Sequence, residues 1–355
     1  MKVGIITFHR VLNYGAVLQT YALQQTLLKL GMECKIIDYR KDEFEKEYRN
    51  LKFDSLSLRE IYHTLKCWMV RKKNVAFLNF IEKNLNLTEP CYNRQDLEKA
   101  TKDLDILLTG SDQVFNYYTT YNDENYYLSF GSNKKKYSYA ASFGFNQFNP
   151  KYDEQVRNWL NGYEQISVRE NEAKQYLEKL LNRHVYLHCD PSFLLSKDEW
   201  KCFVRNSKRK KYVLVYSVGR SKALIDTAEQ IAKKHRLEVL YIKYTYEKCG
   251  TARVITDASP EDFINLIYNA EYVVTNLFHG LAFSMILEKN FYLCIQDNVC
   301  TNSRLFFLLE QYNLLNRIVD ESKGIIDKDI DYSEIRKRIE MERGQAKDYL
   351  KNMGI

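Results

Sequence analysis

Residues 272–288, YVVTNLFHGLAFSMILE, decide the fold. The first four are apolar or β-branched and predict a short buried strand, residues 276–280 predict a sharp loop, and the apolar run 282–287 predicts a helix. Such a joint gathers backbone N–H groups and the positive end of a helix dipole at one point. His279 lies there, where it can hold a proton or meet an anion near neutral pH. An alternative is that His279 only caps the helix and Gly280 only turns the chain, as in many α/β proteins.

The bulk composition indicates a globular chain long enough for two domains. It has 355 residues, 45% of them hydrophobic and 28% charged, with 4 prolines. No apolar run is long enough to span a bilayer, and residues 1–10 fit a first strand better than a signal peptide. The eight cysteines lack CxxC spacing, which predicts reduced thiols. We therefore expect a cytoplasmic protein without an integral membrane segment.

The net charge of +7 is modest for this length, and the basic clusters at 134–136, 208–211 and 233–234 are short. Solvated lysines on turns and helix faces explain them, and no nucleic-acid-binding signature accompanies them. We expect no nucleic-acid partner. A mild excess of positive charge suits a small anionic substrate.

Predicted strands and helices alternate along the chain. The strand 2–7, the helix 16–30 and the strand 34–39 form a βαβ unit, which implies parallel strands. Further strands are predicted at 105–108, 136–142, 165–169, 185–189, 211–217, 238–243, 272–275 and 291–295. Further helices are predicted at 58–68, 77–85, 152–163, 169–181, 222–235, 260–269, 303–312 and 335–350. The rhythm restarts after residues 190–211, so we expect two α/β halves across a cleft.

Eight residues stand at the carboxyl ends of predicted strands or at helix entries, where sheet proteins bind ligands. They are Asn13, Gly15, Ser111, Asp112, Gln113, Ser142, Arg169 and His279. Several such loops in one chain predict a polar binding site. Turn hydrogen bonding explains Asp112 or Ser142 equally well when each is taken singly. Arg169 either pairs with Glu170 or Glu172 on its own helix or, if buried at a cleft, captures a carboxylate or phosphate.

Several common site signatures are absent from the sequence. There is no G-x-x-x-x-G-K-[ST] phosphate loop, no G-x-G-x-x-G after the first strand and no G-x-S-x-G elbow. His184 and His188 are four residues apart but fall in and around a predicted strand, where they do not form a compact ligand pair. The sequence therefore predicts no metal site.

The chain resembles the polysaccharide pyruvyl transferases. The matching stretches are NYGAVLQTYALQQTLLKLG, IIDYR, LLTGSDQVFN, YSYAASFG, ISVRE, CDPSFLL, TNLFHGLAFSMILEKNF and SRLFFLLEQYNLLNR. Their order and spacing together are specific. The resemblance implies a GT-B-like α/β fold in which two Rossmann-like domains with parallel sheets face a central cleft. Residues 1–195 would form the acceptor-side domain with a helical excursion at 41–99, residues 196–330 the donor-side domain, and residues 331–355 a C-terminal amphipathic helix.

The resemblance also implies a reaction. The donor is phosphoenolpyruvate, no cofactor is needed, and the product is a sugar that carries a pyruvate ketal. The acceptor is a saccharide of a surface polysaccharide or its lipid-linked precursor, as in exopolysaccharide biosynthesis. A lipid-linked acceptor would bring the cytoplasmic enzyme to the inner face of the membrane as a peripheral protein.

Site residues follow from the same resemblance. In relatives, a His in the F/L-H-G motif and an Arg in the R-E/D motif contact the donor, and the matching residues are His279 and Arg169. Many relatives carry Arg or Ser two residues before this His, whereas Leu277 stands here, and Arg304 is a candidate substitute. The predicted donor-binding set is Arg169, Asn276, Phe278, His279, Gly280 and Arg304, and the predicted acceptor-binding set is Asn13, Gly15, Ser111, Gln113 and Ser142.

Ketal formation needs an acid and a base, each worth roughly a hundred- to ten-thousand-fold in rate. We assign phosphate binding and proton donation to His279, and we assign the base on the acceptor hydroxyl to Asp112. Two alternatives remain open. One is a GT-B glycosyltransferase that uses a nucleotide-sugar donor, with Glu288 or Asp297 on the ribose. The other is a non-catalytic binding protein on the same fold.

Overall fold

The computed structural model describes residues 1–41, 58–205, 211–217, 222–243, 249–295, 302–319 and 328–354, with side chains of the helix that begins at Leu58 described from residue 71. The chain forms two compact units. Unit 1 comprises Met1–Glu45, Ile81–Leu195 and Arg336–Ile355, and unit 2 comprises Lys46–Phe80 and Ser196–Ile335. The chain thus passes from one unit to the other four times, the third time between Leu195 and Ser196.

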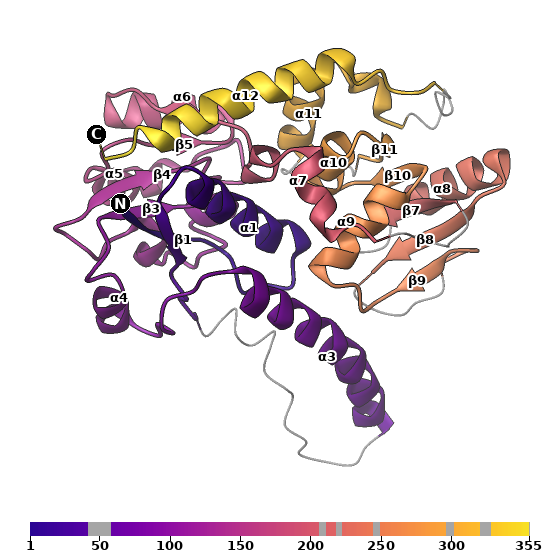
Figure 1. Cartoon of the computed structure of the whole chain (residues 1–355), viewed down its shortest axis with the longest axis horizontal. Coiled ribbons are helices and arrows are strands. Elements are labelled where there is room, and N and C mark those ends of the chain that lie inside the picture. The colour runs from indigo at the N-terminus through magenta and orange to yellow at the C-terminus, as the bar shows by residue number, and fades with distance from the viewer. Residues whose placement is uncertain are drawn as a thin grey trace. The chain divides into compact units, whose positions relative to one another are not determined.

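The sheet of unit 1 is parallel and has the order β2-β1-β3-β4; Figure 1 labels β1, β3 and β4 of this sheet. Its strands are β1 (Lys2–Ile6), β2 (Glu33–Ile36), β3 (Ile106–Thr109) and β4 (Lys135–Ser138). The register sets Val3 opposite both Cys34 and Ile106. A second parallel pair, β5 (Ser167–Val168) and β6 (Tyr186–Leu187), joins β4 through isolated bridges. All these strands therefore end at one carboxyl edge.

Helices of unit 1 pack on this sheet through their apolar side chains. They are α1 (Tyr14–Lys29), α4 (Arg94–Ala100), α5 (Asp153–Leu160), α6 (Asn171–Leu181) and most of α12 (Ser333–Lys351), with short 3-10 turns η1 (Gln113–Phe115), η2 (Glu124–Tyr127), η3 (Pro150–Tyr152) and η4 (Pro191–Leu194). In α1, Val17, Leu23 and Leu27 are fully buried. Helix α1 lies against β2 and η4.

The C-terminal helix α12 belongs mainly to unit 1, whereas residues 331–355 are expected from the sequence to form an element separate from both domains. The Tyr349 hydroxyl donates to the carbonyl of Ser138 at the end of β4, 2.8 Å away. Arg343 Nε donates to the carbonyl of Phe193 at 2.8 Å. Apolar Ala346 and Leu350 are fully buried, so the amphipathic face of α12 is part of the unit 1 core.

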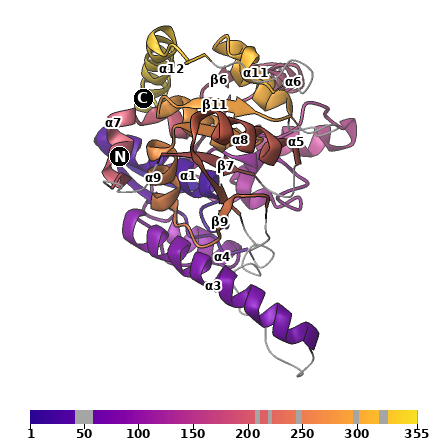
Figure 2. The ribbon, with the colours of Figure 1, turned by 90° about the vertical axis from the view of Figure 1, so that its right-hand side faces the viewer.

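The sheet of unit 2 is also parallel, in the order β11-β10-β7-β8-β9. Its strands are β7 (Tyr212–Tyr216), β8 (Glu238–Ile242), β9 (Arg253–Ile255), β10 (Tyr272–Thr275) and β11 (Asn290–Leu293). Its helices are α7 (Lys197–Trp200), α8 (Lys222–His235), α9 (Pro260–Asn269), α10 (Phe278–Ile286) and α11 (Asn302–Gln311), with η5 (Lys201–Phe203) and η6 (Leu315–Arg317). Helix α8 packs on β7, β8 and β10 (Figure 2).

Residues 58–84 form one helix, α3 (Leu58–Asn84), so the predicted pair of helices at 58–68 and 77–85 is wrong. The intervening stretch 69–76 contains neither Pro nor Gly, so nothing in the chain breaks the helix there. The prediction assigns the whole helical excursion at 41–99 to the N-terminal domain, whereas Lys46–Phe80 belongs to unit 2. The ring of Phe80 packs 5.7 Å from that of Phe203 in η5.

The predicted loop at 276–280 is wrong, because α10 already begins at Phe278. Leu277 is extended at the N-cap position, and the N–H of Leu281 donates to its carbonyl at 3.0 Å to close the first turn. His279 therefore lies in the first helical turn. The edge strand β9 and the helix α4 are not predicted at all. β9 has only three residues, RVI, and α4, RQDLEKA, has Leu97 as its one large apolar residue, so neither is long or apolar enough to show a periodicity.

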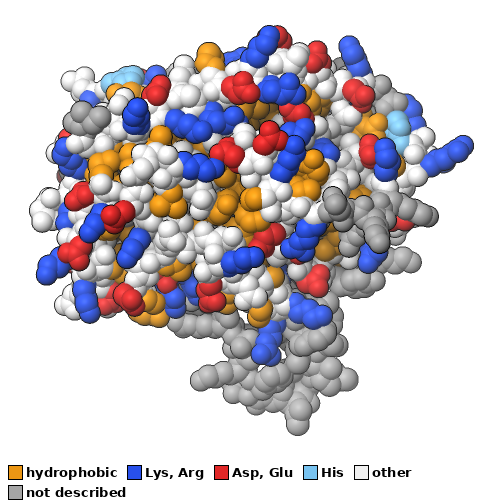
Figure 3. Space-filling view, in the orientation of Figure 1, with side chains coloured by type: hydrophobic (Ala, Val, Ile, Leu, Met, Phe, Trp, Pro, Cys, Tyr) orange, Lys and Arg blue, Asp and Glu red, His pale blue; other side chains and the backbone are white. Residues whose placement is uncertain are grey.

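The surface view shows lysine and arginine side chains interspersed with acidic and apolar ones over the coloured part of one face (Figure 3). Among the helices that the structure describes, none is both long enough and apolar enough to cross a bilayer.

Candidate functional site

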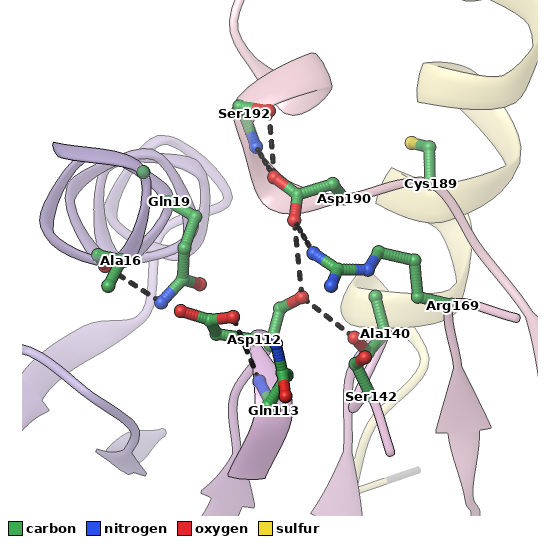
Figure 4. Close-up of polar contacts among 12 residues, drawn as sticks. Ala16, Gln19, Asp112, Gln113, Ala140, Ser142, Arg169, Cys189, Asp190 and Ser192 are labelled. Atoms are coloured by element: carbon green, nitrogen blue, oxygen red, sulfur yellow. Dashed lines mark hydrogen bonds and ion pairs between the residues drawn. The ribbon is translucent and has the colours of Figure 1, made fainter. Parts of the chain in front are cut away.

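A cluster of buried charged side chains occupies the carboxyl edge of the unit 1 sheet (Figure 4). Arg169 directly follows β5 and forms an ion pair with Asp190, three residues after β6. Its Nε also lies 3.6 Å from Oε1 of Glu170. Burial lowers the pKa of Arg169, but the carboxylates of Asp190, Glu170 and Asp112 outweigh this effect and raise it above its ordinary value. Three carboxyl groups thus surround one guanidinium, which leaves little positive charge for an anionic ligand.

Asp112, three residues after β3, has a backbone conformation that favours glycine, with φ 69° and ψ −173°. Such strain costs on the order of 1–3 kcal/mol and persists only where the surroundings impose it. The backbone N–H groups of Val114 and Ser142 impose it here by donating to the Asp112 carbonyl at 2.7 and 2.9 Å. An imposed strained conformation is more typical of a functional residue than of a simple turn cap.

The Asp112 carboxylate is only half engaged. Oδ1 accepts a hydrogen bond from the Gln113 N–H at 2.9 Å, while Oδ2 accepts none from any residue that the structure describes. The residue retains 8% of its surface exposed. One carboxylate oxygen is therefore available to a ligand or solvent, as a general base requires.

The other predicted polar residues of this edge lie beside Asp112, but their side chains are engaged within the unit. Ser111 donates to the Ala140 carbonyl at 2.7 Å, and Ser142 donates to Glu170 Oε1. Gln113 Oε1 accepts from the Asn116 amide at 2.9 Å. These side chains shape the loops that present Asp112.

Asn13 and Gly15 lie at the start of α1. The Asn13 carboxamide oxygen accepts from the N–H groups of Gly15 and Ala16 at 2.9 and 3.4 Å and so caps the helix. Gly15 is buried within the first turn. The structure thus gives Asn13 a clear structural task, and its role toward an acceptor stays a prediction.

A second charged group lies at the carboxyl end of β2. His9 Nε2 is 3.0 Å from Asp38 Oδ1, and Arg40 donates to Asp38 Oδ2 from Nε and Nη2 at 3.0 and 2.7 Å. Burial acts to raise the pKa of Asp38, but hydrogen bonds from His9 and Arg40 hold it well below its usual range. This ion network fixes the loop between β1 and α1 to the end of β2.

The carboxyl edge of the unit 2 sheet is built differently. The start of helix α10 packs closely against the end of β10. A Cβ added at Gly280 would lie only 2.3 Å from Thr275 Oγ1 and 3.0 Å from the Tyr216 ring. Only glycine fits at this position, and the helix N-terminus with His279 is thereby held against the strand end. Leu277 at the N-cap offers no side-chain cap to α10. A helix N-terminus next to a histidine is suited to binding an anion.

The remaining predicted donor residues also lie in unit 2. The rings of Phe278 and His279 meet edge to face, with centroids 5.2 Å apart. Asn276 Oδ1 is buried and accepts no hydrogen bond from the described residues. Arg304 lies in α11, and Glu288, named for the nucleotide-sugar alternative, pairs with Lys197 at 2.6 Å. Asp297 lies outside the described residues.

The predicted residues thus fall into two groups. The structure brings together Ser111, Asp112, Gln113, Ser142 and Arg169 in unit 1, while Asn276, Phe278, His279, Gly280 and Arg304 belong to unit 2. Among the described residues, no group of three or more His, Cys, Asp or Glu side chains is placed to hold a metal ion.

Sequence reasoning missed three residues of the unit 1 cluster, namely Gln19, Glu170 as a site residue, and Asp190. Asp190 accepts from both the N–H and the hydroxyl of Ser192, at 2.9 and 2.7 Å, as well as from Arg169. The turn residues DPS directly after a strand were a signal for it, because this position also lies at the carboxyl edge. Gln19 was hidden in the interior of a predicted helix.

Three solved structures share the fold. A UDP-GlcNAc 2-epimerase from Neisseria meningitidis bound to UDP-GlcNAc is 12% identical with a TM-score of 0.51, covering 98% of this chain and 94% of that one. The UDP complex of MnaA from S. aureus is 13% identical with a TM-score of 0.51, covering 97% and 91%. An α-glucosyltransferase in complex with UDP and a 13-mer DNA containing a HMU base is 10% identical with a TM-score of 0.51, covering 99% and 95%.

Identities this low show the fold alone, and the fold is GT-B, as the sequence predicts. None of the curated proteins is a significant match to this chain. The family model for polysaccharide pyruvyl transferase matches residues 13–298, a range that includes both Asp112 and His279. The match spans most of the chain and confirms the resemblance seen in its motifs. The chain therefore belongs to the polysaccharide pyruvyl transferase family.

Proposed function

We propose that this protein transfers the pyruvyl group of phosphoenolpyruvate to a saccharide and forms a pyruvate ketal on a surface polysaccharide or its lipid-linked precursor. The observation that carries the proposal is the family match over residues 13–298. The contrast between the two sheet edges supports it, since the reaction joins an anionic donor to a hydroxyl-bearing acceptor.

The donor carries a carboxylate and a phosphate, so its site has to supply positive charge and N–H donors. The edge of unit 2 offers the N-terminus of α10 and the imidazole of His279, which is 8% exposed. We assign His279 to binding the phosphate and to proton donation. An imidazole N–H can donate a hydrogen bond to a phosphate oxygen, and an imidazolium can transfer a proton.

The acceptor hydroxyl needs a base. Asp112 fits this role because its strained backbone is imposed by neighbouring N–H groups and its Oδ2 accepts no hydrogen bond from a described residue. The base removes the proton of the attacking hydroxyl as the methylene carbon of the donor is protonated. Phosphate then leaves, and a second hydroxyl of the same sugar closes the ketal and loses its own proton.

Arg169 fits a positioning role better than a donor contact. The residue is 5% exposed, and its guanidinium is paired with Asp190 and lies 3.6 Å from Glu170, so its charge is compensated within the unit. Arg169 thereby ties the loop after β5 to the loop after β6. A contact from Arg169 to the donor stays a prediction.

The proposal is tested by incubating the protein with phosphoenolpyruvate and a panel of methyl hexosides. Phosphate release and the mass of the glycoside are followed together. We expect phosphate release that depends on glycoside and a product heavier by one pyruvate less one water. Phosphate release without glycoside, or no reaction with any member of the panel, would count against the proposal.

A nucleotide-sugar transferase is the second candidate, because two of the structural neighbours are complexes with UDP and a third is bound to UDP-GlcNAc. The candidate is checked by the melting temperature of the protein with UDP, UDP-GlcNAc and phosphoenolpyruvate, since a ligand of the native state raises it. A rise with the nucleotides and none with phosphoenolpyruvate would favour this candidate.

A further inference from the structure

Gln19 is fully buried in α1, and its hydrogen bonds fix which way its carboxamide faces. Its nitrogen lies 3.0 Å from Thr7 Oγ1, 2.9 Å from the Ala16 carbonyl and 3.0 Å from Thr20 Oγ1. The two hydroxyl protons are already used, because Thr7 donates to the Ser111 carbonyl and Thr20 donates to the Ala16 carbonyl. All three neighbours are therefore acceptors, and the amide nitrogen has to face them.

The carboxamide oxygen of Gln19 consequently faces the other way. Gln19 Oε1 is buried and accepts no hydrogen bond from any described residue. The side chain reaches from α1 toward Asp112 (Figure 4). The nearby Gln24 differs, because its oxygen accepts from the Asn86 N–H and its nitrogen donates to the Asn86 carbonyl, both at 3.0 Å. Burial in α1 alone therefore does not leave a glutamine oxygen unsatisfied.

Glu170 presents a second unsatisfied oxygen at the same edge. Its Oε1 accepts from Ser142 and lies 3.6 Å from Arg169 Nε, whereas its Oε2 is buried and accepts no hydrogen bond from the described residues. Glu170 is 5% exposed. Ser142 also donates its backbone N–H to the Asp112 carbonyl, so one residue links Glu170 to the proposed base.

Buried oxygens without a donor are costly, and in native proteins they are usually satisfied by water or a ligand. Gln19 Oε1, Glu170 Oε2 and Asp112 Oδ2 are all acceptors. A ligand that satisfies these three oxygens has to bring O–H or N–H donors. A phosphate or carboxylate would add further acceptors to an edge where three carboxyl groups already surround one guanidinium.

We propose that Gln19 Oε1 and Glu170 Oε2 accept hydrogen bonds from hydroxyl groups of a neutral saccharide that binds at the carboxyl edge of the unit 1 sheet beside Asp112. The inference rests on the proposed function in that the saccharide is the acceptor of that reaction. It changes the predicted acceptor-binding set, because Asn13, Ser111, Gln113 and Ser142 use their side chains in internal hydrogen bonds. Two residues outside that set make the direct contacts.

The test measures binding of neutral methyl hexosides by saturation-transfer difference NMR on the whole chain. Gln19→Met keeps the length of the side chain and removes the oxygen. Glu170→Gln replaces Oε2 with an NH₂ donor, because Arg169 Nε and the Ser142 hydroxyl favour an oxygen at the Oε1 position. We expect each variant to weaken glycoside binding at least tenfold.

Two matched controls carry the same substitutions outside the proposed contact. Gln24→Met changes the other fully buried glutamine of α1, and Glu172→Gln changes a glutamate in the first turn of α6, the helix that Glu170 caps. Both should keep glycoside binding within twofold. Because Gln24→Met removes three internal hydrogen bonds, it also shows whether lost stability alone weakens binding. Circular dichroism confirms the fold of every variant.

The outcomes separate this inference from the proposed function. Unchanged binding in Gln19→Met and Glu170→Gln would mean that the two oxygens hold water only, and would overturn the inference. So would the absence of any signal from the glycosides with the wild type. Phosphate release from phosphoenolpyruvate is measured on the same samples. Binding lost in both variants without any turnover by the wild type would keep the saccharide site and reject the donor.

Discussion

The two sheets have the same parallel architecture, yet their carboxyl edges present opposite chemistry. In unit 1 the edge carries Arg169 among three carboxyl groups, and the buried oxygens Gln19 Oε1 and Glu170 Oε2 accept no hydrogen bond from the described residues. In unit 2 the edge carries the N-terminus of α10 with His279 in its first turn. One architecture therefore supplies an acidic edge suited to hydroxyl donors and a positively polarised edge suited to anions.

The two sheets are alike, so the chemical difference between the edges comes from the residues that follow the strands. Asp112 is held in a glycine-like conformation by N–H groups from its own loop and from the loop after β4. His279 is held by the close approach of Gly280 to Thr275. Each device positions one polar side chain near a strand end, where parallel sheets bind ligands.

The largest effect should come from Asp112→Asn. If Asp112 is the base, turnover should fall by about a hundred- to ten-thousand-fold, while glycoside and phosphoenolpyruvate binding persist. Asp112→Gly should be equally inactive yet at least as resistant to urea as the wild type, because glycine relieves the strained backbone. If Asp112→Asn kept the activity of the wild type, Asp112 would not be the general base.

Arg169→Met should mainly lower stability. It leaves Asp190 and Glu170 buried without their cation, which costs about 3–5 kcal/mol when a buried pair loses one partner. Urea unfolding measures this change. The matched control is Arg94→Met, whose partners Glu98 and Glu124 are about half exposed and whose pairs should be worth about 1 kcal/mol or less. Equal stability losses in the two variants would contradict a buried structural role for Arg169.

His279→Gln should weaken phosphoenolpyruvate binding about tenfold or more, because a charge-assisted hydrogen bond contributes about 1.5–3 kcal/mol. Glycoside binding should be unchanged, since the proposed saccharide contacts lie in unit 1. His184→Gln is the control, because His184 is an exposed histidine that faces Glu178 at 3.3 Å. Loss of glycoside binding in His279→Gln as well would contradict the assignment of the saccharide contacts to unit 1.

The smallest effect concerns pH. Because Asp38 has a lower pKa in the folded chain than in the unfolded one, it stabilises the fold above its unfolded pKa of about 3.9, and this contribution is lost as pH falls below that value. Asp38→Asn should therefore be less stable than the wild type at pH 7, and the gap should narrow between pH 4 and pH 2. Urea midpoints across this range test it, and a constant gap would contradict the ion network as its cause.

The sequence was sufficient for the architecture wherever local pattern dominates. The strand β10 and the helix α8 have the bounds that their β-branched run and apolar periodicity predict. The one-turn error at α10 arose because Phe278 and His279 carry no helix-start signal of their own. That start is set by Gly280 packing on Thr275, which is a contact between two elements and not a property of the local sequence.

The candidate site could be predicted only in part. Asp112 stood out because the GSDQ loop follows an apolar strand, but its strained conformation depends on the N–H of Ser142, a residue 30 positions away. Gln19 gave no signal, because a glutamine within a helix is ordinary until its burial and its three acceptor neighbours are known. Partner choice is decided by tertiary packing, which single-sequence patterns do not contain.

The central claim is that the donor binds at the edge of unit 2 and the acceptor at the edge of unit 1. Calorimetric titration of phosphoenolpyruvate into the wild type, His279→Gln and Asp112→Asn tests it most directly. We predict that the wild type and Asp112→Asn bind with dissociation constants within twofold, and that His279→Gln binds at least tenfold more weakly. Donor binding that Asp112→Asn abolishes and His279→Gln retains would place the donor in unit 1 and contradict the account.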